Sequence, residues 1–227
     1  MTEKVVAITG AYKGLGAAIS ELLAKKGYKL VLGGKNKKEL DTFAQKLNKL
    51  TNVIGVILNV RKKSDCKNFI QTAFEKFGHL DILINNAGFL GKKCSIEDLS
   101  EDELKNSFET NLYGPVFLSQ EAVKLMKRQE SGYILNIGST SAIDYSSSNL
   151  AYGSSKSALI GFTGIRNELK ETGIRVSVFN PGGMKTVLFR NQPGRKTDNY
   201  MDPKYAAQKI VDILESDSDE WNIVLKK

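Results

Sequence analysis

The sequence has few of the residues that histidine and metal chemistry require. His79 is the only histidine among 227 residues, and the two cysteines, Cys66 and Cys94, lie far apart without the spacing of a metal site. A histidine-based triad or a multi-histidine metal site is therefore largely excluded. Two widely separated cysteines are typical of a reduced protein, so we expect no metal and a cytoplasmic location.

Long hydrophobic runs are also lacking. No apolar run approaches the roughly 20 residues that cross a bilayer, and the N-terminal residues lead directly into a strand pattern instead of a signal peptide. The net charge of +8 falls largely in short basic runs, such as residues 35–38 and 61–63, without interleaved aromatic residues. We therefore expect neither a membrane nor a nucleic acid as a partner.

What the chain does contain is a regular alternation of short apolar runs and helix-length amphipathic stretches. We expect strands at residues 4–9, 29–32, 53–58, 81–85, 133–137, 174–179 and 222–225, with helices between them, one of which is continuous from Ser100 to about Arg128. Strands that are apolar on both faces predict a parallel, doubly wound α/β sheet of Rossmann type, covered by helices on both sides. No composition break or linker divides the chain, so we expect one domain over residues 1–227.

A glycine-rich segment, Thr9-Gly10-Ala11-Tyr12-Lys13-Gly14-Leu15-Gly16, lies between the first strand and the first helix. Its glycines allow a tight turn and the close approach of a pyrophosphate, and the helix N-terminus behind them offers unpaired N–H groups. An ordinary glycine-rich turn is the alternative. The strand–loop–helix context favours a dinucleotide.

The end of the second strand lacks the acid that NAD-binding folds use to bind the adenosine ribose. Lys35 stands there, and the first carboxylate that follows belongs to Glu39. Lys13, inside the glycine loop, could reach the same place. These lysines predict a preference for NADP over NAD, and the alternative is that Lys35 merely begins a solvated helix.

A tyrosine and a lysine stand one helical turn apart, at Tyr152 and Lys156, and Ser139 precedes them in another segment. A positive lysine on the same helix face lowers the pKa of a phenol from about 10 towards the range of a general acid or base. A serine hydroxyl could bind the same substrate oxygen. Each residue alone has a plainer interpretation, because Ser139 could belong to a polar loop and Tyr152 could pack at a helix start.

Taken together, these segments resemble the short-chain dehydrogenase/reductase family in its compact single-domain form, over nearly the whole chain. The family's signatures occur in the expected order. They are Thr9 to Gly16, Asn85-Asn86-Ala87-Gly88, Asn111, Ser139, Tyr152-Gly153-Ser154-Ser155-Lys156 and Pro181-Gly182-Gly183-Met184-Lys185-Thr186.

The resemblance implies an oxidoreductase that transfers a hydride between NADP(H) and a carbonyl or alcohol carbon. Tyr152 would be the general acid or base, Ser139 would bind the substrate oxygen, and Asn111 would hold a water of a proton relay to Lys156. The implied cofactor-binding residues are Gly10, Tyr12, Lys13, Gly14, Leu15, Gly16, Lys35, Asn59, Val60, Asn86, Ala87, Gly88, Tyr152, Lys156, Pro181, Gly182 and Thr186.

The sequence departs from the family pattern at two places. Asn59-Val60 stands where the family commonly has Asp-Val, although an asparagine can still bind an adenine edge. The region between Thr186 and Asp202 is short, so we expect a shallow, open substrate site. Residues 144–150 and 187–190 should line that site. Arg190 or Arg195 could meet an anionic substrate and the basic surface could meet an acidic carrier protein, but the favoured interpretation is that these are ordinary exposed cations.

The resemblance leaves the assembly and the exact activity open. It implies a homodimer or homotetramer formed through the helices that carry Asn111 and Tyr152. The alternative function is an NADP-binding redox sensor without turnover, for which the catalytic residues would be unnecessary. An epimerase or dehydratase is a third possibility, but such enzymes need a larger substrate domain.

Overall fold

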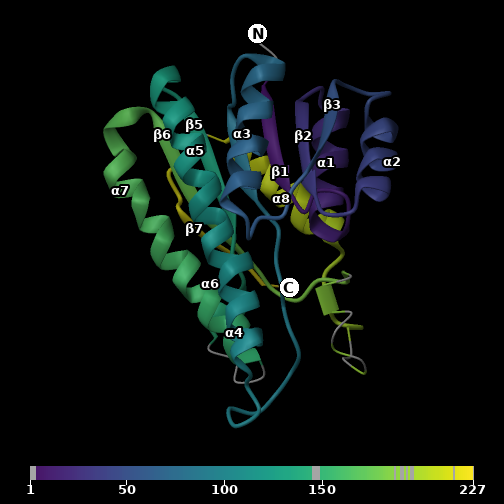
Figure 1. Cartoon of the computed structure of the whole chain (residues 1–227), viewed down its shortest axis with the longest axis vertical. Coiled ribbons are helices and arrows are strands. Elements are labelled where there is room, and N and C mark those ends of the chain that lie inside the picture. Colours follow the sequence, from purple (N-terminus) through teal and green to yellow (C-terminus); the bar gives the residue numbers. More distant parts are fainter. Residues whose placement is uncertain are drawn as a thin grey trace.

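A computed structural model describes residues 4–144, 149–186, 188–189, 192, 194, 197–216 and 218–226 (Figure 1). It contains a seven-stranded parallel sheet in the order β3-β2-β1-β4-β5-β6-β7. The strands are β1 (Val5–Thr9), β2 (Lys29–Gly34), β3 (Val53–Ile57), β4 (Ile82–Asn85), β5 (Gly132–Ile137), β6 (Ile174–Pro181) and β7 (Asn222–Leu225). This topology confirms the predicted doubly wound α/β fold of Rossmann type.

Helices connect the strands, and two of them begin directly after an N-capping residue that the sequence indicated. The side chains of Ser100 and Asp202 accept N–H groups at the starts of α4 and α8, as expected of N-caps. The helices are α1 (Gly14–Lys25), α2 (Lys37–Leu47), α3 (Lys63–Phe77), α4 (Glu101–Phe108), α5 (Gly114–Gln129), α6 (Leu150–Phe162), α7 (Arg166–Leu169) and α8 (Pro203–Glu215).

The continuous helix expected from Ser100 to about Arg128 is wrong in one detail. A π-helical turn, Glu109–Tyr113, separates α4 from α5. This turn contains Asn111, whose side-chain amide forms hydrogen bonds with the main chain of Phe89 in the loop after β4. Such wide turns are rare and occur frequently at functional sites.

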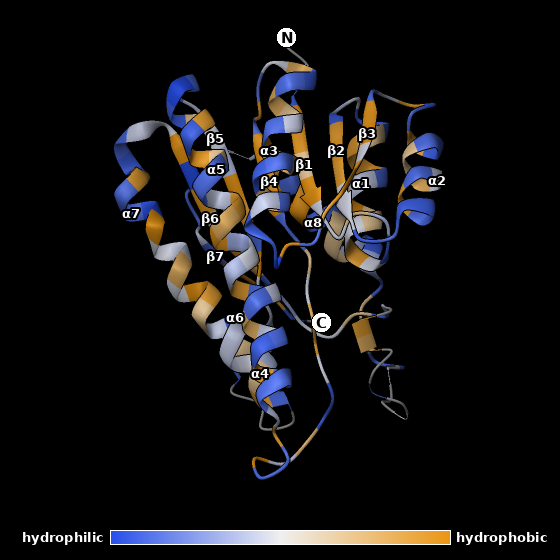
Figure 2. Cartoon of the chain, viewed as in Figure 1, coloured by the Kyte–Doolittle hydropathy of each residue, from blue (hydrophilic) through white to orange (hydrophobic). Residues whose placement is uncertain are grey.

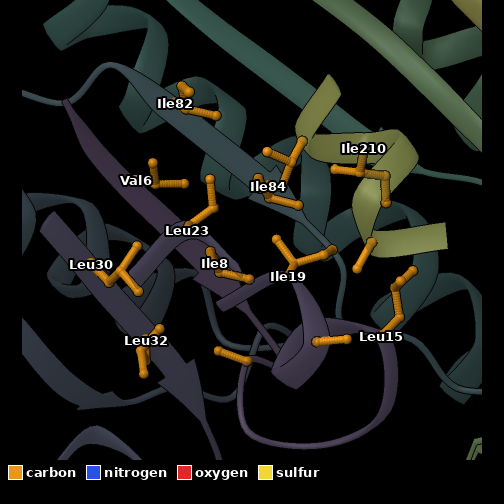
Figure 3. Packing of buried hydrophobic residues seen from close by; sticks show 14 of the residues in the cluster. Val6, Ile8, Leu15, Ile19, Leu23, Leu30, Leu32, Ile82, Ile84 and Ile210 are labelled. Atoms are coloured by element: carbon orange, nitrogen blue, oxygen red, sulfur yellow. The ribbon is translucent and has the colours of Figure 1, made fainter. Parts of the chain in front are cut away.

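Two apolar cores lie on opposite faces of the sheet, which explains why the strands are apolar on both sides (Figure 2). On one face, α1 and α8 pack against β1, β2 and β4. Ile8, Ile19 and Ile210 meet there (Figure 3). On the other face, α3 and α5 cover the strands through residues such as Phe69 and Leu118.

The functional edge of the sheet follows from the strand order. The winding direction reverses between β1 and β4, so the loops after these strands diverge and leave a crevice at the carboxyl edge. The glycine loop follows β1, Asn86 to Gly88 follow β4, and Ser139 follows β5. Within the described ranges, no helix combines the length and apolar character needed to cross a membrane.

Candidate active site

A cavity of about 740 Å³ lies at this carboxyl edge, and most of the predicted site residues form its wall. The predicted residues in the wall are Gly10, Tyr12, Lys13, Gly14, Leu15, Lys35, Val60, Asn86, Ala87, Gly88, Ser139, Tyr152, Lys156, Pro181, Gly182 and Thr186. Gly16, Asn59 and Asn111 are not among the residues of the wall. The cavity therefore joins the glycine loop to the tyrosine, lysine and serine.

The loops after β1 and β4 are bonded to each other at the base of the cavity. The hydroxyl of Thr9 accepts the N–H groups of Asn86 (3.0 Å) and Ala87 (2.9 Å). Asn86 Nδ2 donates in return to the carbonyls of Thr9 (2.8 Å) and Gly10 (3.1 Å). Asn86 thus fixes the glycine loop and also lines the cavity.

The start of α1 leaves an anion site open. Gly16 must be glycine, because a Cβ there would lie 2.2 Å from the carbonyl oxygen of Gly10. Gly14 has φ +54°, and Thr186 packs against it from the loop after β6. No side chain caps the first N–H groups of α1. Gly14 and Leu15 at this helix start line the cavity, which fits the pyrophosphate of a dinucleotide.

Basic side chains lie at the β2 end of the cavity. Lys35 is in the wall, and although the residue is exposed overall, partial desolvation, followed by the nearby charge of Arg61, lowers the pKa of its ammonium group below the ordinary value. Lys13 Nζ forms an ion pair with Glu39 Oε2 at 2.6 Å, and Glu39 also lines the cavity. The role of Glu39 was missed at the sequence level, although its place in the first turn of α2 puts it near Lys13.

Asn59 organises the turn after β3. Its Oδ1 accepts the N–H of Arg61 (3.3 Å), and its own N–H donates to Asp65 Oδ2 (3.1 Å). The neighbouring Leu58 and Val60 form the cavity wall. The proposed contact of Asn59 with adenine stays a prediction.

Ser139 is held by the end of strand β6. Its main-chain N–H donates to Asn180 Oδ1 (3.1 Å), and its hydroxyl accepts the N–H of Ser141 (3.1 Å). Asn180 Nδ2 donates to Asn222 Oδ1 (2.7 Å), which connects the serine to β7. Asn180 was also missed, although a polar residue that ends an apolar strand, directly before Pro181, is a usable signal.

Lys156 is buried, with 3% of its surface exposed, beneath the tyrosine. Its Nζ donates to the carbonyl of Ile137 (2.6 Å) and lies 5.9 Å from the centre of the Tyr152 ring. Burial lowers the pKa of the Lys156 ammonium group from its ordinary value of 10.5 to about 7. Both protonation states are therefore accessible near neutral pH.

Asn111 connects the loop after β4 to the helix that carries Tyr152. Its amide bonds both main-chain groups of Phe89 at 2.8 Å, and its Nδ2 also donates to Ser155 Oγ (2.9 Å). Ser155 Oγ in turn donates to the carbonyl of Tyr152 (2.8 Å). The Asn111 side chain is thus committed to structural bonds, and the water relay stays a prediction.

The substrate end of the cavity is mainly apolar where the structure describes it. Phe189 and Tyr200 pack with ring centres 5.3 Å apart, and Asp144 at the rim pairs with Lys226 at 2.9 Å. The apolar wall consists of Phe89, Leu90, Met184, Leu188, Phe189 and Tyr200.

We expected a shallow, open substrate site because the loop between β6 and α8 is short. This loop nevertheless supplies several side chains to the cavity wall. Leu188, Phe189 and Tyr200 from this loop wall the cavity on one side. Asn149 and Leu150, which were also expected to line the site, are not among the residues of the cavity wall. The remaining expected lining residues 145–148, 187 and 190, and the candidate cation Arg195, lie outside the described part of the chain.

Comparison with known proteins identifies the family. Residues 4–197 match the family described as short chain dehydrogenase. The chain belongs to this short-chain dehydrogenase family, whose members are oxidoreductases that use a nicotinamide cofactor. An uncharacterized oxidoreductase of Staphylococcus aureus (strain USA300) is 36% identical over 189 residues, which cover 83% of this chain and 81% of the relative.

Two solved structures share the architecture of this chain. An alcohol dehydrogenase from the archaeon Thermococcus sibiricus, complexed with 5-hydroxy-NADP, is 28% identical with a TM-score of 0.89 and covers 98% of this chain and 96% of its own. Levodione reductase is 25% identical with a TM-score of 0.90, and the match covers 99% of this chain and 96% of the reductase.

Proposed function

We propose that this short-chain dehydrogenase is an NADP(H)-dependent oxidoreductase that interconverts a carbonyl and an alcohol, with Tyr152 as the general acid or base. The observation that carries the proposal is that Tyr152, Lys156 and Ser139 share the wall of the same cavity as the glycine loop. The proposal covers one domain over residues 1–227 in the cytoplasm, acting without a metal, a nucleic acid or a membrane as partner.

The residues divide the chemistry between them. When bound, the nicotinamide supplies or accepts the hydride. Tyr152 protonates the carbonyl oxygen in the reductive direction, while the Ser139 hydroxyl donates a hydrogen bond to that oxygen, a contribution of roughly 3 kcal/mol when removed. The ammonium group of Lys156 favours the phenolate form of Tyr152 and, as the family resemblance implies, would also bind the nicotinamide ribose hydroxyls.

The preference for NADP is supported by the basic end of the cavity. Lys35 and Lys13 both line the cavity, so we expect both ammonium groups to meet a 2′-phosphate. Glu39 competes for Lys13 in the absence of that phosphate. The Thermococcus relative, which shares the fold, binds an NADP derivative. Comparable affinities for NADPH and NADH in a titration of the purified protein would contradict the preference.

The activity is tested by following NADPH oxidation with ketones, aldehydes, quinones, 3-oxoacyl thioesters and levodione. We expect Tyr152→Phe to lower turnover by roughly a thousandfold, because the phenolic proton is lost. NADPH affinity should stay nearly unchanged, since the ring remains in the wall. Tyr205→Phe, an exposed tyrosine on α8, is the matched control and should keep full activity.

The alternative sensor function makes the opposite prediction. A sensor would bind NADPH tightly and turn over none of the compounds, and Tyr152→Phe would then have no measurable effect. Turnover that survives in Tyr152→Phe would contradict the assignment of the general acid. An epimerase or dehydratase would be recognised by product formation without net cofactor consumption.

A further inference from the structure

Gln192 joins three segments at the substrate end of the cavity. It lies in the loop between β6 and α8 and is only 8% exposed although it is polar. Its Nε2 donates to Asn149 Oδ1 (2.5 Å) and to the carbonyl oxygen of Gly91 (3.3 Å). Gly91 belongs to the loop between β4 and α4, and Asn149 directly precedes α6. Loop side chains ordinarily face water, so a buried amide that bridges two other segments calls for a reason.

The carbonyl oxygen of Gly91, which accepts a hydrogen bond from Gln192, lies in a loop held against α4. Gly91 has φ +72°, and a Cβ there would lie 2.1 Å from the carboxylate of Glu103. The N–H of the next residue, Lys92, donates to Glu103 Oε2 (3.3 Å). The loop at Gly91 is therefore packed on the first turn of α4, and Gln192 binds to an anchored carbonyl.

The other two segments that Gln192 joins, its own loop and the start of α6, contain residues of the candidate site. The N–H of Gln192 donates to the carbonyl of Phe189 (2.9 Å), and Phe189 packs on Tyr200 in the apolar wall. Asn149 stands just before the first turn of α6, the turn that contains Tyr152. Gln192 thus connects the apolar wall to the helix start that presents the proton donor.

We propose that Gln192 is a positioning residue that sets the distance between the apolar substrate wall and Tyr152. This inference rests on the proposed function. Without the bridge, a bound substrate would be less well oriented towards the tyrosine, and even a small misplacement of reacting groups lowers the rate strongly. The described hydrogen bonds of Gln192 go to Gly91, Asn149 and Phe189 and not to the glycine loop, so we expect cofactor binding not to change.

The first experiment compares Gln192→Leu with the wild type. We expect kcat/KM to fall about tenfold through both KM and kcat, with an unchanged Kd for NADPH. Amide hydrogen exchange in residues 149–152 should become faster, because Asn149 loses its hydrogen bond to Gln192. Gln208→Leu removes a similar amide bond to Asp212 on the exposed face of α8 and should change none of these values.

The second experiment is a double-mutant cycle. If Gln192 acts through Asn149, then Asn149→Ala should lower kcat/KM in the wild type but have little further effect in Gln192→Leu. In the Gln208→Leu background, Asn149→Ala should keep its full effect. Additive losses in the Gln192→Leu background, or unchanged kinetics in Gln192→Leu alone, would overturn the proposal.

The exchange measurement separates this proposal from the proposed function, because it needs no turnover. Unchanged exchange in residues 149–152 of Gln192→Leu overturns the positioning role, whatever the activity. If the wild type turns over no substrate while Gln192→Leu shows faster exchange, the proposed function fails and the bridge to α6 stands.

Discussion

At the scale of single residues, Lys156 couples stability to pH. Its ammonium group has a pKa of about 7 in the folded chain and an ordinary value of 10.5 when exposed. Between these values the unfolded chain binds more protons at this site, so the free energy of unfolding rises with pH in that window. From pH 7 to pH 9 the gain from this group is about 2 kcal/mol.

Urea denaturation of the unliganded protein at both pH values tests this prediction. In Lys156→Met the titrating group is absent, so the gain between pH 7 and pH 9 should be smaller by that amount than in the wild type. Equal gains in the two proteins would show that Lys156 keeps its charge throughout the window.

A second residue-scale prediction concerns the cofactor's phosphate. We expect Lys35→Met to lower the affinity for NADPH about tenfold and to leave the affinity for NADH unchanged, because only NADPH carries the 2′-phosphate. Glu39→Gln frees Lys13 and should raise NADPH affinity roughly threefold, a small effect because the pair is partly exposed. Fluorescence titration of both cofactors measures these changes, with Lys38→Met, an exposed lysine of α2, as the control. Equal losses for NADPH and NADH in Lys35→Met would place Lys35 away from the phosphate.

At the scale of elements, the contact between α1 and the glycine loop sets a strict size limit. In Gly16→Ala the added Cβ would lie 2.2 Å from the Gly10 carbonyl and 2.6 Å from Asn86 Nδ2, so the helix start must shift. We expect a loss of about 2 kcal/mol in the free energy of unfolding and weaker NADPH binding. Gly164→Ala is the control, because its Cβ would meet no atom within 4 Å. Equal stability of the two variants in urea would contradict the close contact.

The elements also show what the sequence could and could not predict. The strands were predictable because they are short, mainly apolar runs, most of them apolar on both faces. The glycine loop and the tyrosine helix were predictable because short local patterns encode them. The π-helical turn at Asn111 was not, since it depends on bonds to Phe89 and Ser155, which lie far away in sequence. The role of Gln192 was missed for the same reason, because its partners Gly91 and Asn149 are brought near only by the fold. Glu39 and Asn180 also act through residues distant in sequence, although each carried a local signal in its position.

At the scale of the whole molecule, the outer face of α6 predicts self-association. Within α6 the single charged residue is Lys156, and it is buried. The exposed positions include Ser154 and Gly161, and a Cβ at Gly161 would meet no atom within 4 Å. In Figure 2 this helix is pale to orange, whereas the outer turns of α4 are blue. Exposed helix faces ordinarily carry charged side chains, so we expect a second copy of the chain to cover this face.

Gly161→Arg tests this assembly. The folded monomer has space for the arginine side chain at this exposed position, but a second copy packed on α6 would bury the arginine's charge. Burying an unpaired charge costs about 4 kcal/mol, which corresponds to roughly a thousandfold weaker association. Light scattering should therefore show the wild type as a dimer or tetramer and Gly161→Arg as a smaller species with an unchanged circular dichroism spectrum. Gln208→Arg on the exposed face of α8 should leave the assembly intact. A monomeric wild type, or an assembly that survives Gly161→Arg, would show that α6 faces solvent and that its lack of charge has another cause.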